Sequence, residues 1–251
     1  PLASWEWSND LLMKSWIKAF FNRCSYVQCP TQAVRKLLEK YGCKSRLEVI
    51  SNGTSIPVEP VKASMPSTGP YLILTTGRLC EVKKQMTLIE AMRYSRHSGE
   101  IQLYFAGNGV NRDKIMAAGT RLVSEGRLKY PPIIAFRTPS ELMELNRKAY
   151  LYVHCSKMEV EGLGCLEAIR EGAVPLIAQG ELVGTSDFAL DERSLFPAGD
   201  AKTLANRIDW WIEHPQERAR MGQEYADFSR KFDIGASISM LIEMYEKALT
   251  R

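Results

Sequence analysis

After residue 70, this 251-residue chain alternates regularly between short apolar runs and amphipathic segments, and this alternation restricts the folds open to it. The apolar runs have the length of buried strands, and the amphipathic segments have the periodicity of helices. Strands that alternate with helices in this way form a parallel sheet with helices on both faces. The sequence therefore predicts an α/β fold with a doubly wound, Rossmann-like parallel sheet.

A proline- and serine-containing linker between residues 57 and 70 separates this alternation from the start of the chain. Before the linker, helices are expected at 9–23 and 31–40 and strands at 25–28 and 47–50. After the linker, strands are expected at 71–75, 102–106, 133–136, 151–153 and 174–178, and helices at 85–94, 113–119, 140–148, 201–213, 215–231 and 234–249.

A polar, glycine-containing turn follows the expected strand at 151–153 and precedes a helix that starts near Leu163. Ligands of open α/β sheets bind at the carboxyl ends of strands, where this turn lies. Two carboxylates, Glu159 and Glu167, mark the turn and the helix, and Gly162 lets an anionic group approach the backbone. The same acids are also typical of a solvated helix start, so the residues alone leave both interpretations open.

The spacing of these residues extends into a longer pattern, Ser156-x-x-Glu159-x-x-Gly162-x-x-x-x-Glu167-Ala168, followed by Glu171-Gly172-Ala173-Val174-Pro175. This pattern resembles the E-x7-E signature of glycosyltransferase family 4, also called glycosyl transferases group 1. Members of that family are retaining, nucleotide-sugar-dependent enzymes of the GT-B fold. The resemblance implies a GT-B type fold, of which this chain carries mainly the C-terminal, donor-binding domain.

The resemblance covers the chain from about Ser25 to the C-terminus and implies three parts. Residues 1–57 correspond to a remnant of the N-terminal, acceptor-side domain, and residues 58–232 to the nucleotide-sugar-binding Rossmann-like domain. Residues 233–251 correspond to a C-terminal helix that crosses back. Most of the family's N-terminal domain is then missing, so we expect either a fragment or a second polypeptide that supplies the other half.

Gly77, Arg78 and Lys83 follow the first strand after the linker. A strand end, a tight turn and two cations suit a diphosphate that is held without a metal. The family pattern G-R-L-x-x-x-K-G matches at Arg78 and Lys83, with Lys84 in place of the usual glycine. The resemblance implies that both cations grip the donor phosphates and stabilise the departing nucleoside diphosphate. On its own, such an Arg-Lys pair more often belongs to a solvated helix start.

The resemblance also assigns roles to the glutamates. It implies that Glu167 accepts hydrogen bonds from the ribose and that Glu159 faces the donor sugar and supports positive charge at its anomeric carbon. The backbone N–H groups of Gly162 and Leu163 would reach the phosphates. Glu161 stands six residues before Glu167 rather than eight, so it receives no catalytic role.

Two further residues, Arg137 and Thr138, fall where the family often contacts the base. No Asp-x-Asp sequence occurs in the chain. Metal-dependent transferases typically use such carboxylates to bridge a divalent ion to the diphosphate, so we expect no metal and no cofactor. His154 ends a strand and is interpreted as a packed neighbour rather than a catalyst.

Charge and cysteine content narrow the class of protein. The formal net charge is +4, and residues 1–50 hold eight Lys and Arg against four acids. The remainder is balanced, which disfavours nucleic-acid binding. The basic, Trp-bearing helix expected at 9–23 fits either packing on protein or peripheral contact with the inner face of an anionic membrane. Six scattered cysteines favour a cytoplasmic protein with reduced thiols.

The reaction implied by the resemblance is transfer of a hexose from a nucleoside-diphosphate sugar, with a UDP-sugar favoured, to an acceptor hydroxyl with retention. The acceptor would be a glycan or a lipid-linked group, as in polysaccharide or glycolipid biosynthesis. A non-catalytic nucleotide-sugar-binding subunit and a GT-B nucleotide-sugar epimerase remain as alternatives. A nicotinamide oxidoreductase is disfavoured, because Gly107-x-Gly109 is followed by Arg112 where a dinucleotide fingerprint has its third glycine.

Overall fold

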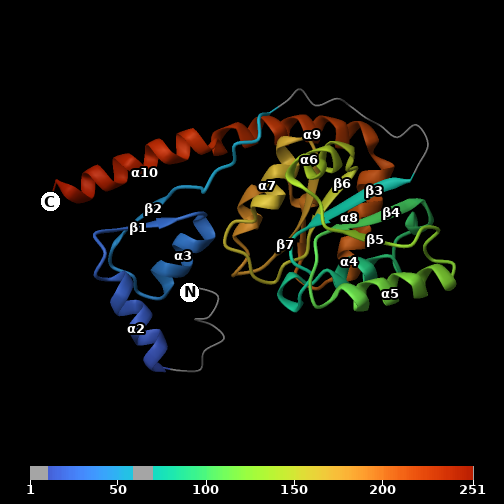
Figure 1. Cartoon of the computed structure of the whole chain (residues 1–251), viewed down its shortest axis with the longest axis horizontal. Coiled ribbons are helices and arrows are strands. Elements are labelled where there is room, and N and C mark those ends of the chain that lie inside the picture. The colour runs from blue at the N-terminus through green and yellow to red at the C-terminus, as the bar shows by residue number, and fades with distance from the viewer. Residues whose placement is uncertain (1–10, 59–69, 251) are drawn as a thin grey trace.

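The computed structural model describes residues 11–58 and 70–250 of the chain, in two neighbouring parts (Figure 1). The larger part is built on a six-stranded parallel sheet. From one edge to the other its strands are β5 (Ile133–Ala135), β4 (Ile101–Ala106), β3 (Tyr71–Thr76), β6 (Leu151–His154), β7 (Val174–Gln179) and β8 (Leu195–Pro197). The strand order runs outward in both directions from β3 and β6, so the sheet is doubly wound, as the sequence predicts.

Helices cover both faces of this sheet (Figure 1). They are α4 (Met86–Ala91), α5 (Arg112–Ser124), α6 (Pro139–Lys148), α7 (Leu163–Arg170), α8 (Ala201–Glu213) and α9 (Pro215–Ser229). Helix α8 packs beside α4, and α9 packs beside α7 and α8. A 3-10 turn, η1 (Glu81–Lys83), follows β3, and another, η3 (Gly184–Phe188), follows β7.

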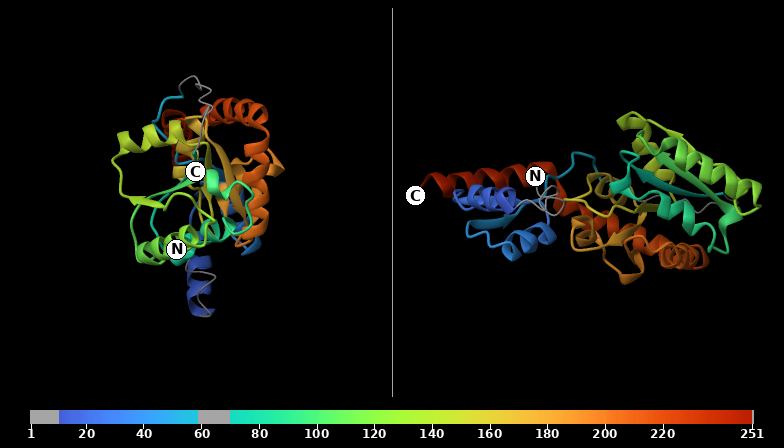
Figure 2. Two further views of the ribbon diagram at one scale, coloured as in Figure 1. Left: turned by 90° about the vertical axis from the view of Figure 1, so that its right-hand side faces the viewer. Right: turned by 90° about the horizontal axis from the view of Figure 1, so that it is seen from below.

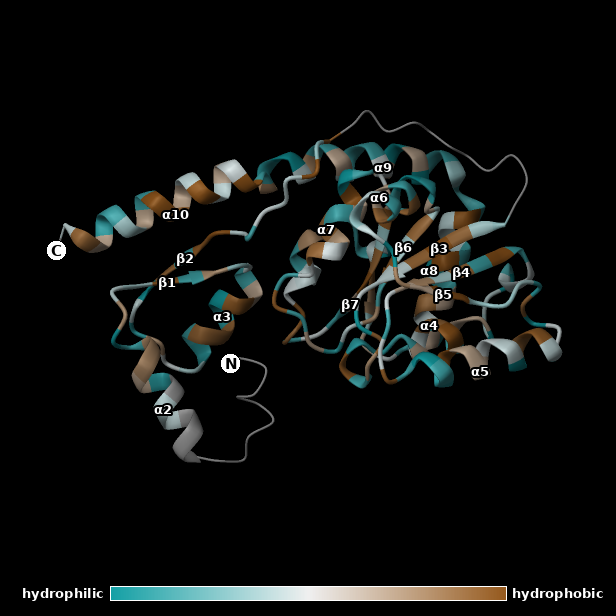
Figure 3. Ribbon diagram, viewed as in Figure 1, coloured by the Kyte–Doolittle hydropathy of each residue, from teal (hydrophilic) through white to brown (hydrophobic). Residues whose placement is uncertain are grey.

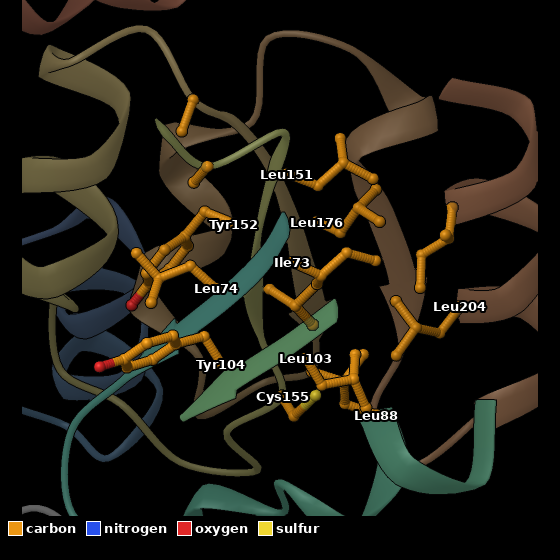
Figure 4. Close-up of a cluster of buried hydrophobic side chains, with 14 of the residues drawn as sticks. Ile73, Leu74, Leu88, Leu103, Tyr104, Leu151, Tyr152, Cys155, Leu176 and Leu204 are labelled. Carbon is orange, nitrogen blue, oxygen red and sulfur yellow. The ribbon is translucent and has the colours of Figure 1, made fainter. Parts of the chain in front are cut away.

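The strand interiors supply the core because successive side chains point to opposite faces of the sheet. In Figure 4, Ile73, Leu103 and Leu176 lie on one face with Leu88 of α4 and Leu204 of α8. On the other face lie Leu74, Tyr104 and Tyr152. Figure 3 shows hydrophobic residues in the central strands, whereas the surrounding helices alternate between hydrophobic and hydrophilic residues along their length. Burial of both faces explains why these strands are continuous apolar runs rather than alternating ones.

The smaller part, here called the N-terminal part, comprises residues 11–57. It contains α2 (Leu11–Phe21), and two parallel strands, β1 (Tyr26–Cys29) and β2 (Arg46–Val49), joined by α3 (Gln32–Lys40). Thr31 caps α3 by accepting from the N–H of Val34 at 3.3 Å. Helix α10 (Ile234–Leu249) leaves the larger part and reaches β1, which makes the molecule elongated (Figures 1 and 2).

Most expected elements are confirmed, with three main differences. Strand β8 was not expected, α4 ends at Ala91 rather than continuing to Tyr94, and α5 continues to Ser124 rather than ending at Gly119. The expected linker falls largely on residues 59–69, and residues 9 and 10 of the first expected helix also lie outside the described residues. The division of the chain at residues 57 and 232 stays a prediction.

The turns after β3 and β4 touch backbone to backbone. The N–H of Gly77 donates to the carbonyl of Ala106 at 3.0 Å, and Gly107 sits directly over the Gly77 carbonyl. A Cβ on Gly107 would lie 1.9 Å from that carbonyl oxygen, a distance that requires the backbone to shift. The Gly107-x-Gly109 sequence is therefore a packing requirement of the sheet.

We expect Gly107→Ala to lower the free energy of unfolding by about 1–3 kcal/mol, the usual cost of overpacking. Gly99→Ala is the matched control, because a Cβ on Gly99 meets no atom within 4 Å. Urea unfolding of both variants measures the difference. Equal stability of the two variants would contradict the close contact between the turns.

Candidate functional site

A cavity of about 320 Å³ opens at the carboxyl ends of β3 and β6, where the strand order reverses. Its lining comes from the turn after β3, the loop after β6, the start of α7 and the end of the N-terminal part. The lining residues are Asn52, Thr76, Gly77, Lys83, Tyr152, His154, Glu159, Val160, Glu161, Gly162, Leu163 and Gly164. Five residues singled out from the sequence meet here: Gly77, Lys83, Glu159, Gly162 and Leu163.

The turn after β3 presents its two cations differently. Lys83 reaches the cavity and pairs with the carboxylate of Glu159. Arg78 follows Gly77 in the chain but does not line the cavity, and it is exposed. Its carbonyl accepts from the side chain of Gln85 at 2.8 Å, and its guanidinium has no partner among the described residues. Lys84 has φ +49°, and no other non-glycine residue in the described ranges has a positive φ. The left-handed conformation explains why a glycine suits this position, and a lysine there costs about 1–2 kcal/mol.

Glu159 is fixed by its backbone as well as by its side chain. Its N–H donates to the carbonyl of Leu182 at 2.8 Å, and its carbonyl accepts from Gly184 at 2.7 Å. These bonds form a short bridge between the loop after β6 and the loop after β7. The Glu159 side chain is 19% exposed. Its carboxylate pairs with Lys83, and both residues line the cavity.

His154 also lines the cavity and adjoins Glu159. Burial lowers the pKa of His154 to about 4, partly opposed by the nearby carboxylate of Glu159. The imidazole is therefore neutral at neutral pH, and its 3.6 Å approach to Glu159 is not an ion pair. Its Nε2 lies 3.3 Å from the hydroxyl of Thr185, which fits the expected packing role.

The start of α7 provides N–H groups. Gly162 is its N-cap with φ +86°, and a Cβ there would lie 2.3 Å from the Thr185 hydroxyl oxygen. A Cβ on Gly164 would lie 2.3 Å from the hydroxyl of Thr76 at the end of β3. The N–H groups of Leu163 and Gly164 have no acceptor among the described residues, as expected for a first helical turn. They line the cavity, where an anionic group can accept from them.

Glu167 lies one turn further along α7 than Leu163. Its side chain is half-buried, burial raises its pKa, and its carboxylate has no partner among the described residues. A half-buried acid without a donor is unfavourable for the folded chain alone. It is a suitable acceptor for hydroxyl groups of a ligand.

Arg137 and Thr138 lie away from the cavity lining, at the end of β5 and the start of α6. Arg137 donates from Nε to the hydroxyl of Tyr104 at 2.5 Å. Thr138 caps α6 in a capping box, in which its N–H donates to Glu141 at 2.8 Å. Their contact with a base therefore stays a prediction.

Several lining residues were not identified from the sequence as parts of a site, among them Asn52, Thr76, Tyr152 and Glu161. Thr76 ends β3, and its strand-end position was the available signal, whereas Tyr152 lies within the apolar run of β6 and carried no such signal. Asn52 comes from the N-terminal part, and no local pattern predicts that it meets the loop after β6.

The described residues contain neither a metal-binding cluster nor a membrane-spanning helix. No group of three or more His, Cys, Asp or Glu side chains is placed to hold a metal ion in residues 11–58 and 70–250. In the same ranges, each helix is too short or too polar to cross a bilayer.

Comparison with known proteins identifies the family to which the chain belongs. Residues 61–227 match the family described as glycosyl transferases group 1, and the chain belongs to this family. It is similar to the catalytic domain of the cholesterol-α-glucosyltransferase of Helicobacter pylori, with 38% identity and a TM-score of 0.59 over 65% of this chain and 99% of that domain.

More distant relatives extend the comparison. The α-monoglucosyldiacylglycerol synthase of Streptococcus pneumoniae is 24% identical over 67% of this chain, which spans only 40% of that relative. The sucrose-phosphate synthase of Thermosynechococcus elongatus has the same fold, with 21% identity and a TM-score of 0.79 over 96% of this chain and 62% of that one. Anabaena HepE in complex with UDP-glucose aligns with 21% identity and a TM-score of 0.77 over 93% of this chain and 67% of that one. The GT-B type fold is thereby confirmed.

We expect Glu167→Gln to stabilise the ligand-free protein at pH 8. The raised pKa of Glu167 means that its charged form destabilises the fold at high pH. The penalty disappears as the pH falls through that pKa, so the gain of the variant should shrink toward pH 4. Thermal unfolding across this pH range measures it. Glu243→Gln, at an exposed position of α10, is the control and should show no such trend.

Proposed function

We propose that this chain carries the donor-binding half of a retaining glycosyltransferase that moves a hexose from a UDP-sugar to an acceptor hydroxyl without a metal. The observation that carries the proposal is the meeting of Lys83 with Glu159 in one cavity, beside the free N–H groups of α7. A cation and N–H donors suit a diphosphate, and a carboxylate suits a sugar ring. The two features are adjacent, as they are in a nucleoside-diphosphate sugar.

In this proposal, Arg78 and Lys83 hold the diphosphate. A pair of unit charges 4 Å apart interacts with about 4 kcal/mol at an effective dielectric constant of 20. A helix N-terminus contributes typically ~0.3–1 kcal/mol to an anion. The two cations are therefore the main stabilisers of the leaving group, and the N–H groups of Leu163 and Gly164 assist them.

The reaction breaks the bond between the anomeric carbon and the β-phosphate oxygen and forms a bond from that carbon to the acceptor oxygen. The acceptor hydroxyl gives its proton to the departing phosphate, on the same face of the sugar. Positive charge develops at the anomeric carbon during this exchange. Glu159, held beside the sugar, stabilises that charge, and Glu167 binds the ribose hydroxyls.

The names of the relatives support the choice of substrates. Solved relatives contain UDP or UDP-glucose, and two relatives are named for glucosyl transfer involving cholesterol or diacylglycerol. We therefore infer a UDP-sugar donor and an acceptor with a lipid part. Helix α2 exposes Trp16 and Phe20, at 65% and 55%, which fits peripheral contact with a membrane on the cytoplasmic side.

We expect UDP to bind without metal and to bind about 10–150-fold more weakly to Arg78→Ala, the equivalent of a lost charge-assisted bond of ~1.5–3 kcal/mol. Titration calorimetry with UDP, GDP, ADP and NAD measures the affinity of the wild type and of the variant for each nucleotide. Arg121→Ala is the control, because Arg121 is an exposed residue of α5. Binding of NAD alone, or equal UDP affinity of Arg78→Ala and the wild type, would contradict the proposed site.

Glu159→Gln should separate binding from chemistry. The variant removes the carboxylate that holds Lys83, so UDP affinity is expected to stay equal or to increase. Transfer from UDP-glucose to a sterol or diacylglycerol acceptor in micelles is expected to fall about 100-fold or more, as after loss of other transition-state contacts. NMR of the product should show the α-anomer, and a β-linked product would exclude retention. Donor binding without transfer by the wild type would favour a non-catalytic subunit.

A further inference from the structure

Glu161 is a buried carboxylate in the loop that carries Glu159, and it is only 3% exposed. It faces the turn at residues 51–54, here called the crossing turn, where the chain leaves β2. The hydroxyl of Ser51 donates to Oε1 of Glu161, and the side-chain amide of Asn52 donates to Oε2 at 2.5 Å. The N–H of Asn52 is shared between the two oxygens at 3.3 and 3.2 Å.

These donors are all neutral. None of the ion pairs in the described part of the chain involves Glu161, so hydrogen bonds alone compensate this buried charge. Both oxygens are engaged by one turn, and a carboxylate accepts at each of them. If the crossing turn moved away, the buried carboxylate of Glu161 would lose its hydrogen-bond donors, a situation that folded proteins avoid. The contact between Glu161 and the crossing turn is therefore strongly favoured.

The crossing turn is also bound to the second connection between the two parts of the molecule. The N–H of Thr54 donates to the carbonyl of Phe232 at 3.0 Å, and the N–H of Ile234 donates back to Thr54 at 3.2 Å. Gly53 has φ +70°, and a Cβ there would lie 2.8 Å from the Cα of Ile234. Both places where the described chain passes between the parts therefore meet beside Glu161.

Three consecutive residues of the loop contact three different regions. Glu159 pairs with Lys83 in the cavity, and the carbonyl of Val160 accepts from the hydroxyl of Thr31 at the start of α3, at 3.0 Å. Glu161 then holds the crossing turn. A movement of the N-terminal part relative to the sheet must therefore displace the backbone that presents Glu159, unless these contacts break.

We propose that Glu161 is a positioning residue that couples the placement of the N-terminal part to the geometry of the donor site. The coupling acts through its hydrogen bonds to Asn52, which keep Glu159 and the start of α7 aligned with Lys83. The identity of the positioned group, a donor sugar with its phosphates, rests on the function proposed above. The coupling itself concerns only contacts within this chain.

The test exchanges the carboxylate and the amide across the contact. Asn52→Asp places a second carboxylate against Glu161 and should break the contact. Glu161→Gln keeps one acceptor oxygen at position 161, and rotation of the Asn52 amide can offer its oxygen to the new N–H groups. In the double variant, the glutamine side chain at position 161 keeps its oxygen for Ser51 and the backbone N–H of residue 52, and its amide donates to the new aspartate. We expect UDP-glucose affinity to fall about tenfold in Asn52→Asp, about threefold in Glu161→Gln, and to recover in the double variant.

Hydrogen–deuterium exchange on the full chain supplies a readout that needs no ligand. We expect Asn52→Asp to increase exchange in residues 157–166 and 232–237 together, with β4 unchanged, and the double variant to restore both segments. The control is Glu39→Gln, at an exposed position of α3, which should alter neither exchange nor affinity.

Each other outcome is decisive. Wild-type exchange in Asn52→Asp would overturn the coupling, as would a double variant that is as defective as the sum of the single variants. A lower unfolding temperature with unchanged affinity and no localised exchange would reduce Glu161 to a stabilising residue. If the wild type bound no UDP-glucose, the proposed function would fail, and the exchange pattern would still decide the coupling.

Discussion

The pairing of β3 with β6 brings together the turn after β3 and the loop after β6, which supply most of the cavity lining. Ile73 pairs with Leu151 and Leu74 with Tyr152, although a long stretch of chain separates the two strands. Parallel pairing brings their carboxyl ends to one edge, so the loops that follow them must meet. Lys83 and Glu159, separated by 76 positions, form an ion pair as a direct consequence. The cavity exists because neighbouring crossovers leave this point in opposite directions.

Polar residues in and around the site differ in whether the folded chain already supplies their partners. Glu167 is half-buried without a donor, and Arg78 has no partner for its guanidinium within the described ranges. Glu161 has a full set of donors in the crossing turn, and Thr138 is engaged in capping α6. Groups of the first kind leave interaction energy unused in the isolated chain, and groups of the second kind contribute to its stability.

Much of the fold was predictable because each buried strand is a continuous apolar run bounded by turn residues. Strand β8 was not predicted, because it has only three residues and ends in Pro197, so its pairing with β7 depends on tertiary contacts. The site was predictable where its residues share a local pattern, as Glu159 and Gly162 do. Asn52 and Glu161 form a contact between positions 109 apart, and no spacing within either segment indicates it.

The alternation of strands and helices, the family pattern and the residue types that suit a diphosphate and a sugar all follow from the sequence alone. These properties are local, because periodicity and short motifs act over a few turns of chain. The tertiary structure decided which of these residues meet: it placed Lys83 against Glu159, left Arg137 outside the cavity lining, and tied Glu161 to the crossing turn. Such contacts follow from strand order and from the packing of distant segments, which the chain specifies only as a whole.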